Sequence, residues 1–327
     1  MRTQTPSRRA SSDASGQRLP QSQKNSWGSA LLANIKRYYW LYLFVLPAVA
    51  MYIIFEYIPM GGIVIAFKRY TGAKSIWASK WVGLRWFEQF FGTFYAERTI
   101  KNTLILSLYT MAMFPLPILL ALVFDEVRNQ RYKKTAQTIM YAPHFVSTVV
   151  LISMLSLFFN PNYGFVNKVI EMFGGKSVDY LTDPAAFRHL YVWSGVWQAT
   201  GWGCIIYTSA LSAVDPNLHE AASLDGASRF KRIIHIKLPT ILPTIVIMLI
   251  MRCGTIMSVG TDKVLLMKND LNASTAEVIG TLVYQRGLVD GQYGFAAAVG
   301  LFQNVINFLL LITVNKVSEK VTETSLF

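Results

Sequence analysis

Long apolar runs alternate with shorter polar segments along most of the chain. An α-helix needs about 20 apolar residues to cross the hydrocarbon core of a bilayer, and six runs reach that length. They cover residues 39–67, 100–124, 136–159, 190–214, 238–260 and 293–315. The pattern therefore predicts an all-α membrane protein with six transmembrane helices.

Proline or glycine interrupts several of these runs, as at Pro47, Pro143 and Gly201. Both residue types are commoner in membrane helices than in soluble ones, so they do not argue against the assignment. The first run is longer than a span requires. We expect a break at residues 58–62, where the span ends and a shorter outer piece begins.

The composition agrees with a membrane protein. Of the 327 residues, 53% are hydrophobic and 15% are charged, whereas about 25% are charged in a typical soluble protein. The formal net charge is +13, but the basic residues do not cluster on a soluble module. We therefore expect contact with anionic lipid and no nucleic-acid partner. Cys204 and Cys253 both fall inside apolar runs, which predicts neither a disulfide nor a metal site.

The orientation follows from the short loops, where the positive-inside bias is strongest. Residues 125–135 contain four basic side chains in eleven positions. This loop is expected in the cytoplasm, which places both termini there as well. The predicted organisation is a largely disordered cytoplasmic tail at 1–37, a six-helix membrane domain at 38–317 and a cytoplasmic tail at 318–327.

A mixed-charge segment at 215–238 separates the fourth and fifth runs on the same side. Asp215 followed by proline is typical of a helix start. Gly226 predicts the end of this first short helix, since glycine tolerates a positive φ. Ser228 can cap a second helix, which we expect Leu238-Pro239 to break before the fifth span begins. Periodicity alone also allows an interfacial loop that contacts only lipid.

The order of residues within this segment is more specific. Three residues separate Glu220-Ala221-Ala222 from Gly226, and nine separate Gly226 from Ile236, which is followed by Lys237-Leu238-Pro239. This order resembles the coupling motif of binding-protein-dependent ABC importer permeases. Residues 55–70 and 283–302 are similar to an oligosaccharide-importing subgroup that includes the alginate importer. The resemblance covers most of residues 38–317.

The resemblance implies that several different subunits carry out transport together. A second permease subunit, often a different chain, would complete the pathway, and an extracytoplasmic solute-binding protein would deliver an oligosaccharide. Two cytoplasmic ATPase subunits would bind ATP and Mg, so this chain would need no cofactor. The coupling segment would dock on an ATPase through the motif residues Glu220, Ala221, Ala222, Asp225, Gly226 and Pro239.

No enzyme signature competes with this interpretation. Gly174-Gly175-Lys176-Ser177 imitates the end of a phosphate-binding loop, but position 170 is isoleucine where the first glycine is required. The four histidines lack metal-binding spacing. We expect neither catalysis nor a bound metal.

Charged side chains within the runs are the first candidates for a transport pathway, because a charge in a membrane is costly. Arg252 lies near the middle of the fifth run and Glu56 in the outer half of the first. Arg252 is expected either to contact a sugar or to have a structural role by donating hydrogen bonds to backbone carbonyls. For Glu56 we favour a structural role.

Aromatic and amide side chains are the second group of candidates. Trp193 and Trp197 share a helical face, with Gln198 one step round. The sixth run carries three amides, Gln303, Asn304 and Asn307. The tryptophans suit either a sugar platform or packing at the membrane interface, and the amides suit either a solute or bonds between helices.

The nature of the solute is less constrained. The predicted outer loop at 68–99 holds six basic and two acidic residues, which suits an acidic saccharide or an acidic patch on the binding protein equally. A different solute for an ABC permease is the first alternative. A self-sufficient secondary transporter is the second, but it would need ion-coupling carboxylates within the spans, and only Glu56 is available.

Overall fold

The computed structural model describes residues 34–327, so the predicted N-terminal tail lies almost entirely outside the described residues. Within that range the secondary structure is helical, and the only β-type pairing is one isolated bridge between Lys68 and Trp81. The predicted all-α class is confirmed. The chain divides into two units, Met1–Gly61 and Gly62–Phe327, which are described in turn.

The described part of the first unit is a helix in three sections. α2 (Tyr39–Tyr52) is followed by a π-helical turn, η1 (Ile53–Tyr57), and by α3 (Ile58–Met60). None of these sections has a buried residue. Glu56 lies exposed in the π turn. The break expected at 58–62 takes the form of a change in helix type, since a 3-10 helix, η2, begins at Gly61.

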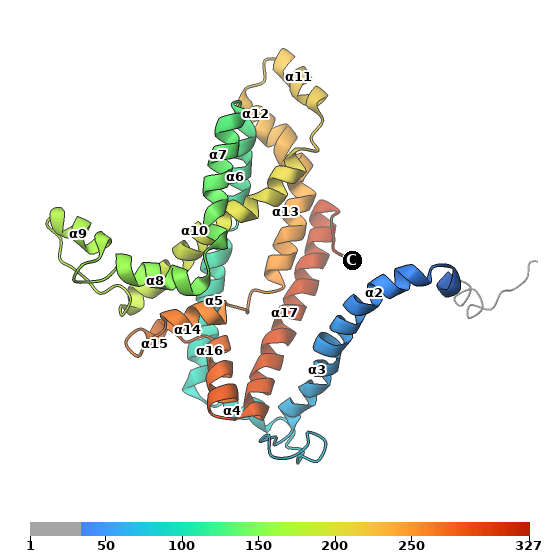
Figure 1. Ribbon diagram of the computed structural model, residues 1–327, viewed down its shortest axis with the longest axis vertical. Coiled ribbons are helices and arrows are strands. Elements are labelled where there is room, and N and C mark those ends of the chain that lie inside the picture. The colour runs from blue at the N-terminus through green and yellow to red at the C-terminus, as the bar shows by residue number, and fades with distance from the viewer. Residues whose placement is uncertain (1–33) are drawn as a thin grey trace, which may run out of the picture. The chain divides into compact units, whose positions relative to one another are not determined.

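The second unit contains the rest of the helices (Figure 1). In chain order they are η2 (Gly61–Phe67), α4 (Arg85–Phe91), α5 (Phe94–Ala112), α6 (Pro115–Glu126), α7 (Gln130–Tyr141), η3 (Ala142–Phe145), α8 (Thr148–Phe158), α9 (Phe165–Met172), α10 (Pro184–Leu211), α11 (Pro216–Leu224), α12 (Arg229–Arg232), η4 (Ile233–Lys237), α13 (Leu238–Cys253), α14 (Thr261–Met267), α15 (Ala273–Ala276), α16 (Ile279–Tyr284), η5 (Gln285–Val289) and α17 (Tyr293–Thr322).

Four helical stretches in the described chain are long and apolar enough to cross a membrane. They are Tyr39–Phe67, Phe94–Glu126, Arg229–Cys253 and Tyr293–Thr322. A bent pair would make a fifth. α10 is 28 residues long but is not among them, and it carries polar side chains such as Arg188 and Gln198. The count of six spans therefore remains a prediction.

The third predicted span is not one helix. Between Gln130–Phe145 and Thr148–Phe158 the chain bends by 98°. Pro143 lies in η3 at the break, and Ser147 caps α8 by accepting a hydrogen bond from the Val150 amide at 3.3 Å. A proline and a new N-cap together end one helix and start another. The run predicted as the third span is therefore two helices joined at a bend, and its crossing of the membrane as one broken span remains a prediction.

Three apolar clusters form the core of this unit, and α10 contributes to two of them. One joins α5, α10 and α14, the second joins α6, α10 and α13, and the third joins α4, α5, α16 and α17. α13 and α17 run side by side (Figure 1). α10 also approaches α7 closely, since a Cβ on Gly201 would lie 1.8 Å from the Met140 carbonyl oxygen. Glycine is required at that crossing.

A buried amide fixes α5 and α10 to the segment before α16. The Asn102 side chain donates to the carbonyl oxygens of Ser274 and Glu277 at 2.9 Å, and accepts from Arg188 at 3.0 Å. The Glu277 carboxylate in turn lies 2.9 Å from Lys268 and 3.4 Å from Arg98. These contacts hold the segment that carries α14 against α10.

Candidate functional site

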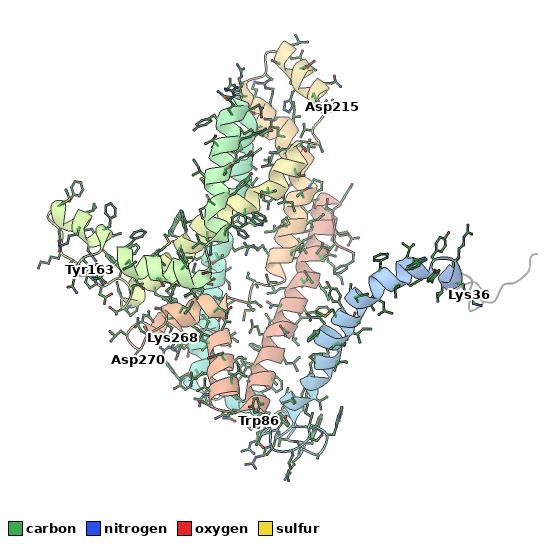
Figure 2. All side chains as sticks on the ribbon, in the orientation of Figure 1. Lys36, Trp86, Tyr163, Asp215, Lys268 and Asp270 are labelled. Atoms are coloured by element: carbon green, nitrogen blue, oxygen red, sulfur yellow. The ribbon has the colours of Figure 1, made fainter. Side chains whose placement is uncertain are left out.

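The segment at 215–238 has the helix–glycine–helix form that its sequence predicts. Asp215 caps α11 by accepting a hydrogen bond from the Asn217 amide at 2.9 Å. Gly226 has a φ of +74°, and Ser228 accepts from the Lys231 amide at 3.3 Å. Figure 2 shows Asp215 beside α11, at one end of the unit.

Leu238-Pro239 does not end the second helix, contrary to the prediction. The chain is helical from Arg229 to Cys253, and the turn before the proline is π-helical. The Leu238 amide bonds to the Ile233 carbonyl oxygen, five residues back. A π turn adds one residue to the helical turn, so Pro239 is accommodated where an α-helical ladder would clash with its ring. α12 is therefore the start of the α13 helix.

The motif residues on α11 and its turn are open to solvent. Glu220, Ala221, Asp225, Gly226 and Pro239 are exposed, and Ala222 is half-buried. α11 also displays two large apolar side chains, because Leu218 is 53% exposed and Leu224 is 89% exposed. A short helix with small and apolar exposed residues is suited to contact another protein surface.

An ion cluster lies directly behind this segment. The Lys237 ammonium is buried and lies 2.6 Å from an Asp125 carboxylate oxygen, and it also donates to Glu126. The two acids form the last turn of α6. Sequence reasoning missed this cluster because Glu126 is 111 residues from Lys237 in the chain, and Asp125 is the residue before Glu126. The sequence feature that could have indicated the cluster is a lone lysine at the edge of an apolar run.

A cavity of about 350 Å³ with a mixed polar and apolar lining lies further along the same helices. Residues from α5, α6, α10 and α13 line it, together with the segment from Thr255 to Lys263. Its lining includes two cations, Arg252 and Lys263, and no described carboxylate. Its other polar side chains are Ser107, Thr110, Tyr191, Gln198, Thr200, Tyr207, Thr255 and Ser258.

The two cations reach the cavity from different helices. Arg252 is in the last turn of α13, and not near the middle of the fifth span as expected, because this helix ends at Cys253. Lys263 is in α14, outside the candidate spans, and donates to the Tyr191 carbonyl oxygen at 2.8 Å. Its ammonium also lies 4.7 Å from the centre of the Tyr191 ring. Burial lowers the pKa of Lys263 to about 8. Sequence reasoning missed this lysine because it lies between the fifth and sixth predicted spans, at 238–260 and 293–315, where no pathway residue was sought.

The predicted tryptophan pair lines a different hollow. Trp193 and Trp197 face an apolar groove of about 360 Å³ between α8 and α10, together with Met154 and Phe158. The Trp193 indole donates to the Tyr109 hydroxyl at 2.9 Å. The structure therefore does not bring these tryptophans together with Arg252.

Most of the predicted amides bond to backbone or to a serine. Gln303 donates to the Met257 carbonyl oxygen at 2.8 Å, and Asn307 accepts from the Met257 amide at 2.9 Å. Both side chains also donate to the Ser258 hydroxyl, at 3.2 and 3.0 Å. They hold the turn after α13 against α17, while Asn304 is exposed. Gln198 lines the cavity but donates to the Val146 carbonyl oxygen at 2.6 Å.

A protein-family comparison identifies what kind of membrane protein has this loop and cavity. Residues 113–322 match the family described as the inner membrane component of binding-protein-dependent transport systems. The chain belongs to this family. The resemblance to ABC importer permeases is thereby confirmed, and this permease is an integral inner-membrane transport component, not an enzyme.

Individual relatives cover nearly the whole permease. Protein LplB of Bacillus subtilis is 41% identical over 92% of this chain and 95% of its own length. The polygalacturonan/rhamnogalacturonan transport system permease protein YteP of the same organism is 39% identical over 91% and 93%. A chain in the crystal structure of a bacterial alginate ABC transporter, complexed with an alginate pentasaccharide-bound periplasmic protein, is 37% identical. It covers 90% of this permease and 99% of its own length, with a TM-score of 0.84.

Proposed function

We propose that this permease forms part of the pathway of an ATP-driven importer for an acidic oligosaccharide, such as an alginate oligosaccharide. The observation that carries the proposal is the cavity, whose described lining holds Arg252 and Lys263 without a carboxylate. Two cations in a partly enclosed cavity attract an anion and repel a cation. Relatives that transport polygalacturonan and alginate support an acidic saccharide.

The chemistry of the lining suits a uronic acid unit. Arg252 can bind a carboxylate in a bidentate manner, and Lys263 can act as a second point charge. The hydroxyls of Thr110 and Tyr207 can bond to sugar hydroxyls. Gln303 and Asn307 would serve this site indirectly, since they hold the turn that joins Arg252 to Lys263.

The transport cycle that we propose needs other subunits. A second permease subunit, encoded as a different chain, would pair with this one and complete the pathway. Two cytoplasmic ATPase subunits would bind ATP and Mg, and an extracytoplasmic binding protein would deliver the sugar. The alginate transporter's complex with its periplasmic protein supports the last partner.

The proposed coupling site is α11 with its glycine turn. Glu220 would make a charged contact with an ATPase subunit, and Ala221 and Ala222 would allow its surface to approach closely. Closure of the ATPase pair would then move α11 and α13 and change the access of the cavity, by the rigid-body movements known for such transitions. This proposal includes six spans over 38–317 and cytoplasmic termini.

Reconstitution in liposomes tests the proposal. The complete complex should hydrolyse ATP faster when its binding protein is loaded with sugar, and should take up uronic oligosaccharides in preference to neutral ones of equal length. Equal uptake of the two series would contradict the acidic solute. Uptake by this permease alone would contradict the ATP-driven mechanism and favour a secondary transporter.

A further inference from the structure

None of the three members of the ion cluster, Lys237, Asp125 and Glu126, lines the cavity, so the cluster is separate from the proposed solute site. We propose that Lys237, Asp125 and Glu126 form a clamp that makes α6 and α13 move together when α11 is displaced. Lys237 is then a positioning residue for coupling. This inference rests on the proposed docking of α11 on an ATPase subunit.

The clamp continues the apolar packing between the two helices. Ile241 is one helical turn after Lys237 and is fully buried in the cluster that also contains Ile118 and Leu122 of α6. Asp125 lies one turn after Leu122, so it shares the face of α6 that packs there. The ionic contact therefore closes the end of an interface that is otherwise apolar.

The charges make this end of α6 dependent on Lys237. Asp125 and Glu126 occupy the C-terminal turn of α6, where the helix dipole disfavours negative charge. The nearby ammonium offsets both carboxylates and the dipole. Removal of Lys237 would leave two partly buried carboxylates without this counter-charge, which favours separation of the two helix ends.

The clamp lies where it can transmit movement. Lys237 is in the π turn η4 between α12 and α13, so a displacement of α11 reaches it before the cavity. Both clamped helices then continue to the cavity, α6 through Pro117 and α13 through Met248 and Arg252. With a rise of 1.5 Å per residue, Met248 is about 16 Å from Lys237 along the helix. Without the clamp, α13 could move while α6 stayed in place.

The test is uptake per ATP hydrolysed by the full complex in liposomes. For K237M we expect this ratio to fall about tenfold, which lies within the range of coupling between distinct sites. Lys237→Arg keeps the charge and should largely preserve the ratio. The double variant K237E/E126K, which exchanges the two charges, should restore part of the ratio. If K237M acted only through a loss of packing, this double variant would not restore the ratio. An unchanged ratio in K237M would overturn the clamp.

Further variants of the ion cluster and of the glycine turn separate a failure of the clamp from a failure of the docking. If K237M does not assemble, the double variant that combines Asp125→Asn with Glu126→Gln decides, since it removes both ion pairs. A lowered ratio supports the clamp and an unchanged one overturns it. Gly226→Pro tests the docking separately. A loss of coupling in G226P but not in the clamp variants would reject the clamp alone, whereas intact coupling in both would reject the docking as well.

Discussion

The side-chain amide of Gln198 donates a 2.6 Å hydrogen bond to the carbonyl oxygen of Val146, at the bend between α7 and α8. A carbonyl at a helix break lacks its helical partner, so the side chain from α10 supplies the missing bond. The bend of 98° is thus fixed by a second helix as well as by Pro143.

Replacement of Gln198 by leucine should therefore destabilise the permease. Loss of a donor to a partly buried carbonyl costs about 1–3 kcal/mol. The melting temperature of the purified permease measures the effect. Asn304→Leu is the matched control, since Asn304 is an exposed amide on α17. Equal melting temperatures for Q198L and the wild type would show that the bend does not depend on this bond.

Gly201→Ala should have a larger effect than Gly203→Ala on the same helix. A methyl group at 201 would lie 1.8 Å from the Met140 carbonyl oxygen, whereas at 203 it would lie 3.4 Å from a Pro117 side-chain atom. Overpacking of this kind costs about 1–3 kcal/mol or more. Yield and melting temperature of the two variants provide the comparison, and equal values would contradict the close crossing of α7 and α10.

Gly226→Ala should weaken coupling less than Gly226→Pro. The φ of +74° costs alanine about 1–2 kcal/mol, while proline cannot adopt it at all. No atom outside the adjacent residues lies within 4 Å of a Cβ at this position, so the effect should come from the turn and not from a clash. ATP hydrolysis and uptake are measured together in the full complex. Normal transport by G226P would contradict the docking of this loop.

Lys263→Met should weaken uptake of an acidic oligosaccharide more than uptake of a neutral one. A hydrogen bond to a charged group contributes about 1.5–3 kcal/mol, so the apparent affinity for the acidic solute should fall by about tenfold or more. Concentration series of uptake in liposomes give the affinities. If both solutes lose affinity equally, Lys263 supports the cavity wall without recognising charge.

The pH dependence of uptake offers a separate test of Lys263. Its pKa is lowered to about 8, so its ammonium charge is present below that pH and is lost as the pH rises through it. Uptake of an acidic oligosaccharide should fall in that interval. Lys263→Arg should remove the fall, because arginine stays charged. A fall of the same size in K263R would assign the pH dependence to another group.

Local features were the ones that the sequence could predict. The caps at Asp215 and Ser228 and the turn at Gly226 depend on residues within three positions of each other, and all three are as expected. The bend at Pro143 was not foreseen, since many membrane helices continue past a proline. Whether one does depends on bonds from other helices, here the bond from Gln198.

Features that depend on distant contacts were missed. The partners of Lys237 are on α6, and the carbonyl partner of Lys263 is on α10, so neither contact has a local pattern. The amides Gln303 and Asn307 were expected either to bind a solute or to form bonds between helices. Their partner, the turn at Met257 and Ser258, becomes apparent only when α13 and α17 are side by side.

The continuous helix from Arg229 to Cys253 limits the number of independent states in a transport cycle. A break at Leu238-Pro239 would have provided a hinge, and the loop could then switch while the cavity kept its earlier form. Without the hinge, the two ends of the helix would change together in the proposed cycle. Such all-or-none behaviour would reduce the occasions on which ATP is consumed and no solute moves.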